Sequence, residues 1–387
     1  MALQGNWNYP TPMTVGEGCL YQIAQACHGA GIRKALLVTD PGLAELPMVS
    51  ETVALCREAG IACEVFSRIQ GNPTGENVED GLAVYRQGGF DGVIAFGGGS
   101  SLDAAKAIAL MAGQSLPLWA FEDVGDNWLQ ANAGAIAPVI AIPTTAGTGS
   151  EVGRASVITD TVNHVKKIIF HPKMLPVRVL LDPKVTVGLP PHITAATGMD
   201  ALSHNLEAFC APGYHPMAEG IALEGIRLIK TYLPLAVAKG EDIEARTQML
   251  VASSMGATAF QRGLGGMHAI AHTLGALYDK HHGLLNAILM PYVLAANRPA
   301  IEDRITDLAR YLDLPEPGFD AFLRWVLGFR TELKIPHTLA EIDITLEEAP
   351  RVGEMAVQDP SAGGNPIAFS AEEYSQIFVD AVTGRLP

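Results

Sequence analysis

The sequence predicts an α/β half built on a parallel sheet, followed by an all-helical half. In the first half, short apolar and β-branched runs alternate with amphipathic stretches, as in βα units. Beyond Pro190 and Pro191 such runs largely vanish, and apolar residues recur with a helical period. A chain of 387 residues can form two hydrophobic cores. We therefore expect an α/β domain at residues 1–190 and an all-α domain at 191–387.

Each expected element rests on its own pattern. The expected strands are KALLVTD (34–40), ACEVFS (62–67), DGVIAFG (91–97), PVIAIPTT (138–145) and VRVLLDP (177–183). The expected helices include 51–60 and 77–89 in the first half, and 219–238, 245–260 and 321–333 in the second. Ser100, followed by Asp103, and Thr194 are the residue types that cap helix N-termini, so we expect helices to begin at both places.

Composition excludes several classes of partner. The formal net charge is -15 and no cluster of Lys and Arg stands out, so neither nucleic acid nor an anionic membrane is an expected partner. The start of the chain lacks the pattern of a secretory signal, and no apolar run reaches the roughly 18–20 residues of a membrane span. The five cysteines show no CxxC pairing, which favours reduced core residues of a cytoplasmic protein.

Two loops of the α/β half have the composition of nucleotide-binding turns. The first, FGGGSS, joins an expected strand to a helix, and its bare backbone N–H groups could face an anion at the helix start. The second, PTTAGTGSEV, follows another expected strand, where α/β sheets usually bind ligands. Neither matches GxGxxG, and each could be only a tight βα turn. Asp40 could accept hydrogen bonds from a ribose diol, or it could simply belong to a DPG turn.

The helical half gathers residue types that bind divalent metals. Asp200 and His204 are four residues apart and therefore lie on one face of an expected helix, and His268 and His272 repeat this spacing. His282 follows in HHG, where the helix breaks or turns. One carboxylate and several imidazoles make a plausible metal set, although any single histidine is more often a satisfied core or surface residue than a ligand.

These stretches resemble the iron-containing (group III) alcohol dehydrogenase family over nearly the whole chain. The resemblance rests on VTDPGL, GNPTGENV, FGGGSSLDAAKA, PTTAGTGSEV, LPPHITAATGMDALSHNLEA and MHAIAHTLGALYDKHHGLLNAILMPYV. It implies that the first domain binds a dinucleotide, that the second binds the metal, and that the active site lies between them.

The resemblance also assigns roles to residues. Asp200, His204, His268 and His282 fall on the four metal positions, with His281 as the residue most easily confused with His282. His272 falls near the metal and is a candidate proton relay. Positions that contact the cofactor are Asp40, Asn72, Gly97, Gly98, Gly99, Ser100, Ser101, Asp103, Thr144, Thr145, Thr148 and Lys166.

The implied activity is reversible hydride transfer between NAD(H) and a primary alcohol or its aldehyde, in a homodimer or larger homo-oligomer. The implied metal is Fe²⁺, although the ligand set also suits Zn²⁺. A sugar-phosphate cyclase resembling 3-dehydroquinate synthase would need clustered Lys and Arg in the helical half, which we do not find. A glycerol-dehydrogenase-like enzyme usually has fewer metal histidines. A metal-binding protein without catalysis would leave the two glycine loops unexplained.

Overall fold

The computed structural model describes residues 8, 11–163 and 165–386, which form two compact units. The N-terminal unit spans Tyr9–Gly188, and the helical unit comprises Leu189–Pro387 together with Asn8. Asn8 belongs with the helical unit, since its backbone N–H donates to Gln261 Oε1 over 2.8 Å. The sequence-based division had placed this residue in the first domain.

The N-terminal unit is built on a six-stranded sheet in the order β1-β8-β5-β4-β2-β3, and every pairing in it is parallel. Its strands are β1 (Met13–Val15), β2 (Lys34–Val38), β3 (Ala62–Phe66), β4 (Gly92–Gly97), β5 (Val139–Pro143) and β8 (Arg178–Leu181). The five longer ones match the five expected strands, and β1 is the addition. The predicted α/β fold on a parallel sheet is confirmed.

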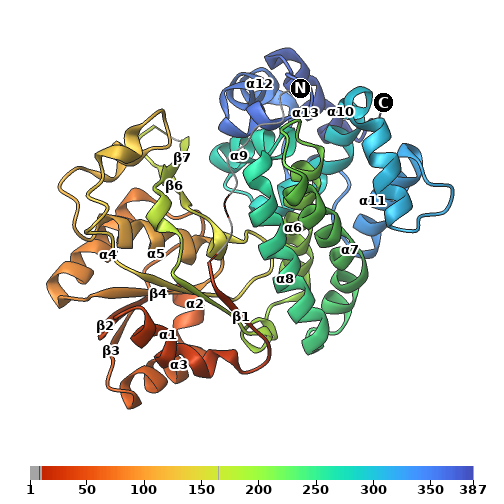
Figure 1. The fold of residues 1–387 in the computed structure, drawn as a ribbon. Helices are drawn as coiled ribbons and strands as arrows, with labels where there is room; N and C mark the ends of the chain where they lie inside the picture. Colours follow the sequence, from red (N-terminus) through yellow and green to blue (C-terminus); the bar gives the residue numbers. More distant parts are fainter. Residues whose placement is uncertain (1–7, 9–10, 164, 387) are drawn as a thin grey trace. The chain divides into compact units, whose positions relative to one another are not determined.

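Helices cover both faces of this sheet, which is why its central strands are apolar along their whole length. The helices are α1 (Ile23–Gly29), α2 (Pro41–Ala44), α3 (Pro47–Glu58), α4 (Gly75–Gly88) and α5 (Gly99–Met111). In Figure 1, α4 and α5 lie on one side of the strands, and α1 and α3 lie on the other. All six residues of β4 are buried, as a strand between two helical layers requires.

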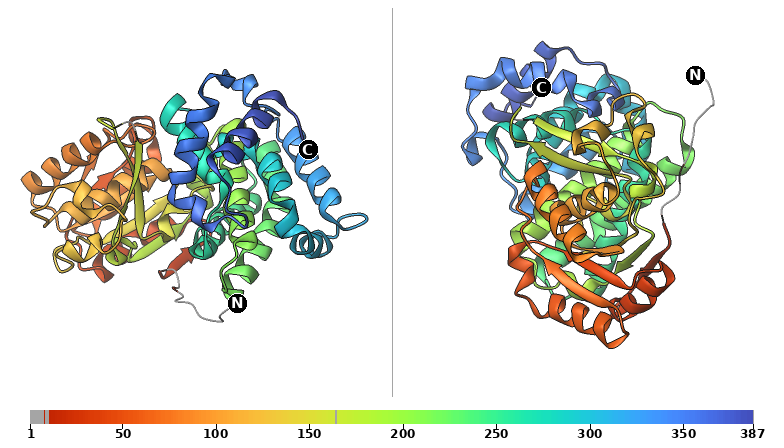
Figure 2. Two further views of the ribbon diagram at one scale, coloured as in Figure 1. Left: turned by 90° about the horizontal axis from the view of Figure 1, so that it is seen from above. Right: turned by 90° about the vertical axis from the view of Figure 1, so that its left-hand side faces the viewer.

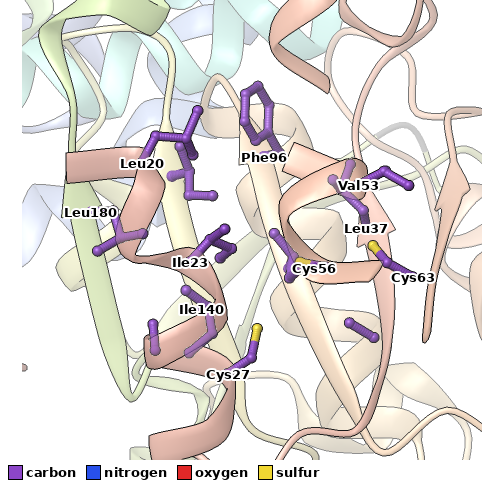
Figure 3. Close-up of a cluster of buried hydrophobic side chains, with 14 of the residues drawn as sticks. Leu20, Ile23, Cys27, Leu37, Val53, Cys56, Cys63, Phe96, Ile140 and Leu180 are labelled. Carbon is purple, nitrogen blue, oxygen red and sulfur yellow. The ribbon is translucent and has the colours of Figure 1, made fainter. Parts of the chain in front are cut away.

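The core beneath α1 and α3 contains three thiols. Cys27, Cys56 and Cys63 come from α1, α3 and β3 and are buried among Leu, Ile, Val and Phe side chains, as Figure 3 shows. All five cysteines of the chain are free and buried. They therefore act as small apolar core residues.

A second, antiparallel pair of strands stands apart from the main sheet. β6 (Ala155–Asp160) and β7 (Val165–Phe170) form this hairpin, which sequence analysis did not predict. Asp160 accepts hydrogen bonds from the backbone N–H groups of Val162 and Asn163 in the turn. In β6, fully buried residues alternate with half-buried ones, so its apolar pattern is weaker than that of the main strands.

The helical unit contains no strand among its described residues. Its helices are α6 (Pro191–Cys210), α7 (Pro216–Ala238), α8 (Ile243–Ala259), α9 (Gly266–Tyr278), α10 (His282–Tyr311), α11 (Phe319–Glu332), α12 (Ala349–Gln358) and α13 (Ala371–Thr383). Figure 2 shows this unit, in green to blue, from two further sides. Helix α6 packs against α7, α8 and α10, so it lies at the centre of the unit. Among the described helices, none combines the length and apolar character that a membrane span requires.

Two expected helix caps differ in the structure. Helix α5 begins after Gly98, which caps it without a side-chain hydrogen bond, and Ser100 lies inside the helix. Helix α6 begins at Pro191, so Thr194 is an interior residue whose hydroxyl accepts from Arg246. Proline is suited to the first helical position because its fixed φ and missing N–H cost nothing there.

Helix α10 tolerates an internal proline because a buried arginine compensates for it. Pro291 has no N–H to donate to the carbonyl of Ala287. Arg330, on α11, instead donates Nη1 to the carbonyl oxygens of Ala287 and Ile288, at 3.4 Å and 2.8 Å. The guanidinium thereby holds the first half of α10 in place.

Candidate metal centre and cofactor loops

The structure brings together the four residues that sequence analysis assigned to a metal. Each of Asp200, His204, His268 and His282 offers one ligand atom, and these atoms all lie within 4.8 Å of one another. Asp200, His204 and His268 are buried, and His282 is half-buried. The ring of His204 stacks on that of His268, with centroids 4.7 Å apart. All four residues belong to the helical unit.

Three helices position these side chains. Asp200 and His204 lie one turn apart on α6, His268 lies in the first turn of α9, and His282 is the first residue of α10. Gly283 allows α10 to begin against α6, since a Cβ there would lie 2.5 Å from the carbonyl oxygen of Ala196. His281 is the N-cap of α10, and its Nδ1 accepts from the N–H of Leu284 at 3.3 Å. His281 therefore caps a helix, whereas the neighbouring His282 offers a ligand atom to the cluster.

Glu207 is a partner of the cluster that sequence analysis missed. Its Oε2 lies 2.7 Å from Nδ1 of His268, and its two oxygens also accept the backbone N–H groups of Gly265 and Met267. With Nδ1 so engaged, the Nε2 lone pair of His268 is the one that can face a cation. Burial alone would lower the pKa of His268, but the charge of Glu207 and the hydrogen bond to it outweigh burial and raise that pKa.

His272 lies beside the cluster and has its own carboxylate partner. Its Nδ1 is 3.0 Å from Asp359 Oδ2, and its ring stacks on that of His282 with centroids 5.1 Å apart. Burial would raise the pKa of Asp359, but the charge of His272 and hydrogen bonds from His272 and Ser361 lower it overall. Asp359 thus fixes the ring orientation of His272.

The donor set fits a divalent transition metal. Three imidazoles and one carboxylate match the nitrogen and oxygen preferences of Fe²⁺ and Zn²⁺. The buried Glu207 behind His268 adds the supporting hydrogen bond that metal-bound histidines usually have. The residues present therefore fit a resident cation.

The two glycine-rich loops of the N-terminal unit touch each other. Thr144 donates its N–H to the carbonyl of Gly97 over 2.9 Å. A Cβ at Gly98 would lie 3.4 Å from Thr145, and one at Gly99 would lie only 2.5 Å from Thr148. Gly97 has a φ of 146°, a conformation that favours glycine. Close approach and backbone geometry therefore explain the glycines even before a ligand is considered.

Most of the other predicted cofactor residues join these loops through hydrogen bonds. Asn72 donates its N–H to Ser100 Oγ at 3.3 Å, and Lys166 donates Nζ to Asn72 Oδ1 at 2.8 Å. Ser101 donates its hydroxyl to Asp40 Oδ2 at 3.5 Å. Asp40 also caps α2 by accepting from the N–H of Leu43. The ends of β2, β4 and β5 thus carry one connected polar surface.

Asp103, another predicted cofactor residue, binds groups of the protein itself. It accepts from the Ser150 hydroxyl at 2.5 Å and from the Val157 N–H at 2.9 Å, and it pairs with the buried Lys106 at 3.2 Å. Lys106 also donates to the carbonyls of Ser150 and Ala155. Burial lowers the pKa of Lys106. This pair, of which Lys106 was missed from the sequence, holds the second loop and β6 against α5.

Comparison with known proteins places these sites in a family. Residues 10–183 match the model of the iron-containing alcohol dehydrogenases, and residues 194–382 match that of the C-terminal region of the Fe-containing alcohol dehydrogenase family. The NAD-dependent methanol dehydrogenase of Bacillus methanolicus is 35% identical over 384 residues, covering 97% of this chain and 100% of that protein. The 4-hydroxybutyrate dehydrogenase of Cupriavidus necator is 37% identical and covers 95% and 97%.

A solved structure agrees with this placement. That of a 1,3-propanediol oxidoreductase superimposes with a TM-score of 0.92 at 34% identity, covering 97% of this chain and 100% of that one. The chain belongs to the iron-containing alcohol dehydrogenase family. The resemblance inferred from the sequence is confirmed, and the protein is an oxidoreductase of the alcohol dehydrogenase class.

Proposed function

We propose that this protein interconverts a primary alcohol and its aldehyde with NAD(H), at a divalent cation held by Asp200, His204, His268 and His282. The observation that carries this proposal is the convergence of these four ligand atoms within 4.8 Å of one another. The similarity to an NAD-dependent methanol dehydrogenase supports the reaction class. Methanol, 4-hydroxybutyrate and 1,3-propanediol appear in the names of relatives, so small alcohols form the first substrate panel.

When bound, the cation supplies a Lewis acid for the substrate oxygen, and nicotinamide supplies the hydride carrier. One aspartate and three neutral imidazoles leave a divalent cation with net positive charge. We assign Fe²⁺ as the native ion on the basis of the family, with Zn²⁺ as the competitor that such ligands bind more tightly.

The protein's own groups orient the ligands and move the proton. Glu207 directs His268, and Asp359 directs His272. His272 is the proposed proton relay, because an imidazole can accept or release a proton near neutral pH and its Nδ1 is already held. In the N-terminal unit, the loops at Gly97–Ser101 and Thr144–Thr148, with Asn72 and Lys166, are the proposed cofactor site. Asp40 is proposed to accept from the adenosine ribose.

The decisive experiment combines metal analysis with an activity panel. Protein expressed and purified without oxygen should contain about one divalent ion per chain, with iron in excess of zinc. In the reduction of small aldehydes, its kcat/KM should be higher for NADH than for NADPH. His282→Ala should lose the ion, whereas His281→Ala should keep it because His281 caps a helix. Full metal content in His282→Ala, with loss in His281→Ala, would reverse the ligand assignment.

We further propose a cytoplasmic, homo-oligomeric enzyme. The five buried free thiols support a reducing compartment. Strand β1 pairs with β8 but with no second strand among the described residues, and sheet edges of this kind often lie in subunit contacts. Light scattering on the purified protein measures the assembly state.

A further inference from the structure

Asn286 lies at the centre of the metal cluster although nothing in the sequence marks it as a ligand. It is fully buried on α10, one turn after His282. Its Nδ2 is 2.9 Å from Asp200 Oδ1, 3.1 Å from His282 Nε2 and 3.2 Å from His268 Nε2. One amide group therefore contacts ligand atoms from α6, α9 and α10.

The environment fixes the direction of this amide. All three neighbours of Nδ2 can accept a hydrogen bond, so the NH₂ end and not the carbonyl end belongs there. At the other end, Asn286 Oδ1 is buried and has no hydrogen-bond partner among the described residues. A buried carbonyl without a partner costs free energy. An apolar side chain would avoid that cost, so packing alone does not explain an asparagine here.

A bound cation would leave the amide one strong partner. Each imidazole nitrogen has a single lone pair, which the cation takes, whereas a carboxylate oxygen keeps a further lone pair while it ligates. The Nδ2 group would then donate to Asp200 Oδ1 alone. Asp200 is the only carboxylate among the four ligand residues, so its orientation matters most for the charge that the cation experiences.

We propose that Asn286 is a positioning residue of the metal centre, which acts by donating a hydrogen bond to Asp200 and so holding this carboxylate in its ligating orientation. The proposal rests on the metal site of the proposed function. A neutral amide does this without adding charge. An aspartate at the same position would cancel the net positive charge that polarises the substrate oxygen. The role thus requires a donor that is neutral, short and buried.

The test compares zinc affinity in full-length variants, measured by competition with a chromophoric chelator. Asn286→Leu removes both polar ends, and Asn286→Ser keeps a small polar side chain too short to reach Asp200. Thr52→Val is the control, since Thr52 is a buried residue of α3 in the N-terminal unit whose hydroxyl donates to the carbonyl of Met48. Thermal unfolding in EDTA shows which variants fold, and Asn286→Ser carries the test if Asn286→Leu does not.

We expect both Asn286 variants to bind zinc about 10–100-fold more weakly than the wild type, as supporting hydrogen bonds at metal sites usually contribute. The control should lose stability but not affinity. In a background of Asp200→Ala, the effect of Asn286→Leu should disappear, because the hydrogen bond has lost its acceptor. The absorption spectrum of bound Co²⁺ should change in Asn286→Leu, which a loss of stability alone, as in Thr52→Val, would not cause.

Two results would overturn this role while leaving the proposed function intact. One is unaltered zinc affinity in both Asn286 variants while the wild type binds zinc normally. The other is an undiminished effect of Asn286→Leu when Asp200 is already alanine. A wild-type chain that binds no divalent ion would refute the proposed metal site itself.

Discussion

Glu207 and His268 form a buried hydrogen bond in which Oε2 and Nδ1 lie 2.7 Å apart. Glu207 accepts two further backbone N–H groups at the start of α9, so its oxygens are surrounded by donors. A carboxylate oxygen accepts hydrogen bonds, so His268 donates to it through Nδ1. The helix that carries His268 is therefore tied to the helix that carries Asp200 and His204.

The first prediction concerns this carboxylate. Glu207→Gln must turn its NH₂ group either toward the Met267 N–H or toward the Gly265 N–H and His268 Nδ1. At least one hydrogen bond at the start of α9 is lost in either case, so the hold on His268 should weaken. Metal affinity, measured by chelator competition, should fall by about 10–100-fold. Glu372→Gln, at an exposed position in the first turn of α13, is the control and should change nothing. Unchanged affinity in Glu207→Gln would show that the carboxylate, with both of its accepting oxygens, is not needed to hold His268.

The second prediction concerns the close approach of α10 to α6. Gly283→Ala places a methyl group 2.5 Å from the Ala196 carbonyl oxygen and 2.9 Å from Asp200 Cβ. We expect a loss of about 1–3 kcal/mol in the free energy of unfolding, together with reduced metal content. Gly328→Ala, in α11, is the control, since its Cβ meets nothing within 4 Å. There, better helix propensity should stabilise by about 0.5–1 kcal/mol. Equal urea midpoints for both variants would contradict the prediction.

The third prediction separates the two tasks of Asp40. Asp40→Gly removes the cap of α2 and the charge, whereas Asp40→Asn keeps a good cap and removes only the charge. If the charge excludes the 2′-phosphate of NADP, both variants should raise kcat/KM for NADPH relative to NADH. The gain should be about 1–3 kcal/mol in differential binding. Two results would contradict exclusion of the 2′-phosphate by the Asp40 charge. One is an unchanged NADH-to-NADPH ratio of kcat/KM in Asp40→Asn, and the other is a preference of the unmutated enzyme for NADPH.

The fourth prediction concerns His272. His272→Ala should keep the bound metal and the fold, and it should lower kcat by about 10²–10⁴-fold with a smaller change in KM, as the loss of a proton-transfer group does. Asp359→Asn should have a weaker effect, because an amide oxygen can still accept from Nδ1. Loss of the metal in His272→Ala would show that His272 is a ligand. Full activity of this variant would show that His272 has only a structural role.

The main sheet was predictable because its strands are buried on both faces. β2, β4 and β5 are therefore continuous apolar runs that periodicity can detect. The hairpin β6–β7 was missed since its residues are only partly buried, and β1 was missed because three residues make no pattern. The expected helix starts at Ser100 and Thr194 were wrong, although both are good capping residues. Helix α5 begins after Gly98, and α6 begins at Pro191.

Helical spacing predicted part of the metal cluster, and His282 was assigned from HHG and the family resemblance. Asp200 and His204, or His268 and His272, show a spacing of four that indicates a shared face. Glu207 extends the face of Asp200 by two turns and could have been found in the same way. Asp359 could not, because it meets His272 only through the packing of segments 87 residues apart. Asn286 follows His282 by four residues, but an asparagine carries no sign of a metal site by itself.

The order of these residues along the chain has a consequence for biosynthesis. The ribosome releases Tyr9–Gly188 first, and domains generally fold as they emerge. Asp200 and His204 follow, but the last proposed ligand, His282, emerges later, and Asp359 later still. Between residues 204 and 268, the growing chain therefore offers a passing ion only one carboxylate and one imidazole. If these residues bind the ion as proposed, the complete ligand set exists only after His282 has been made, when both glycine-rich loops of the N-terminal unit are already in place.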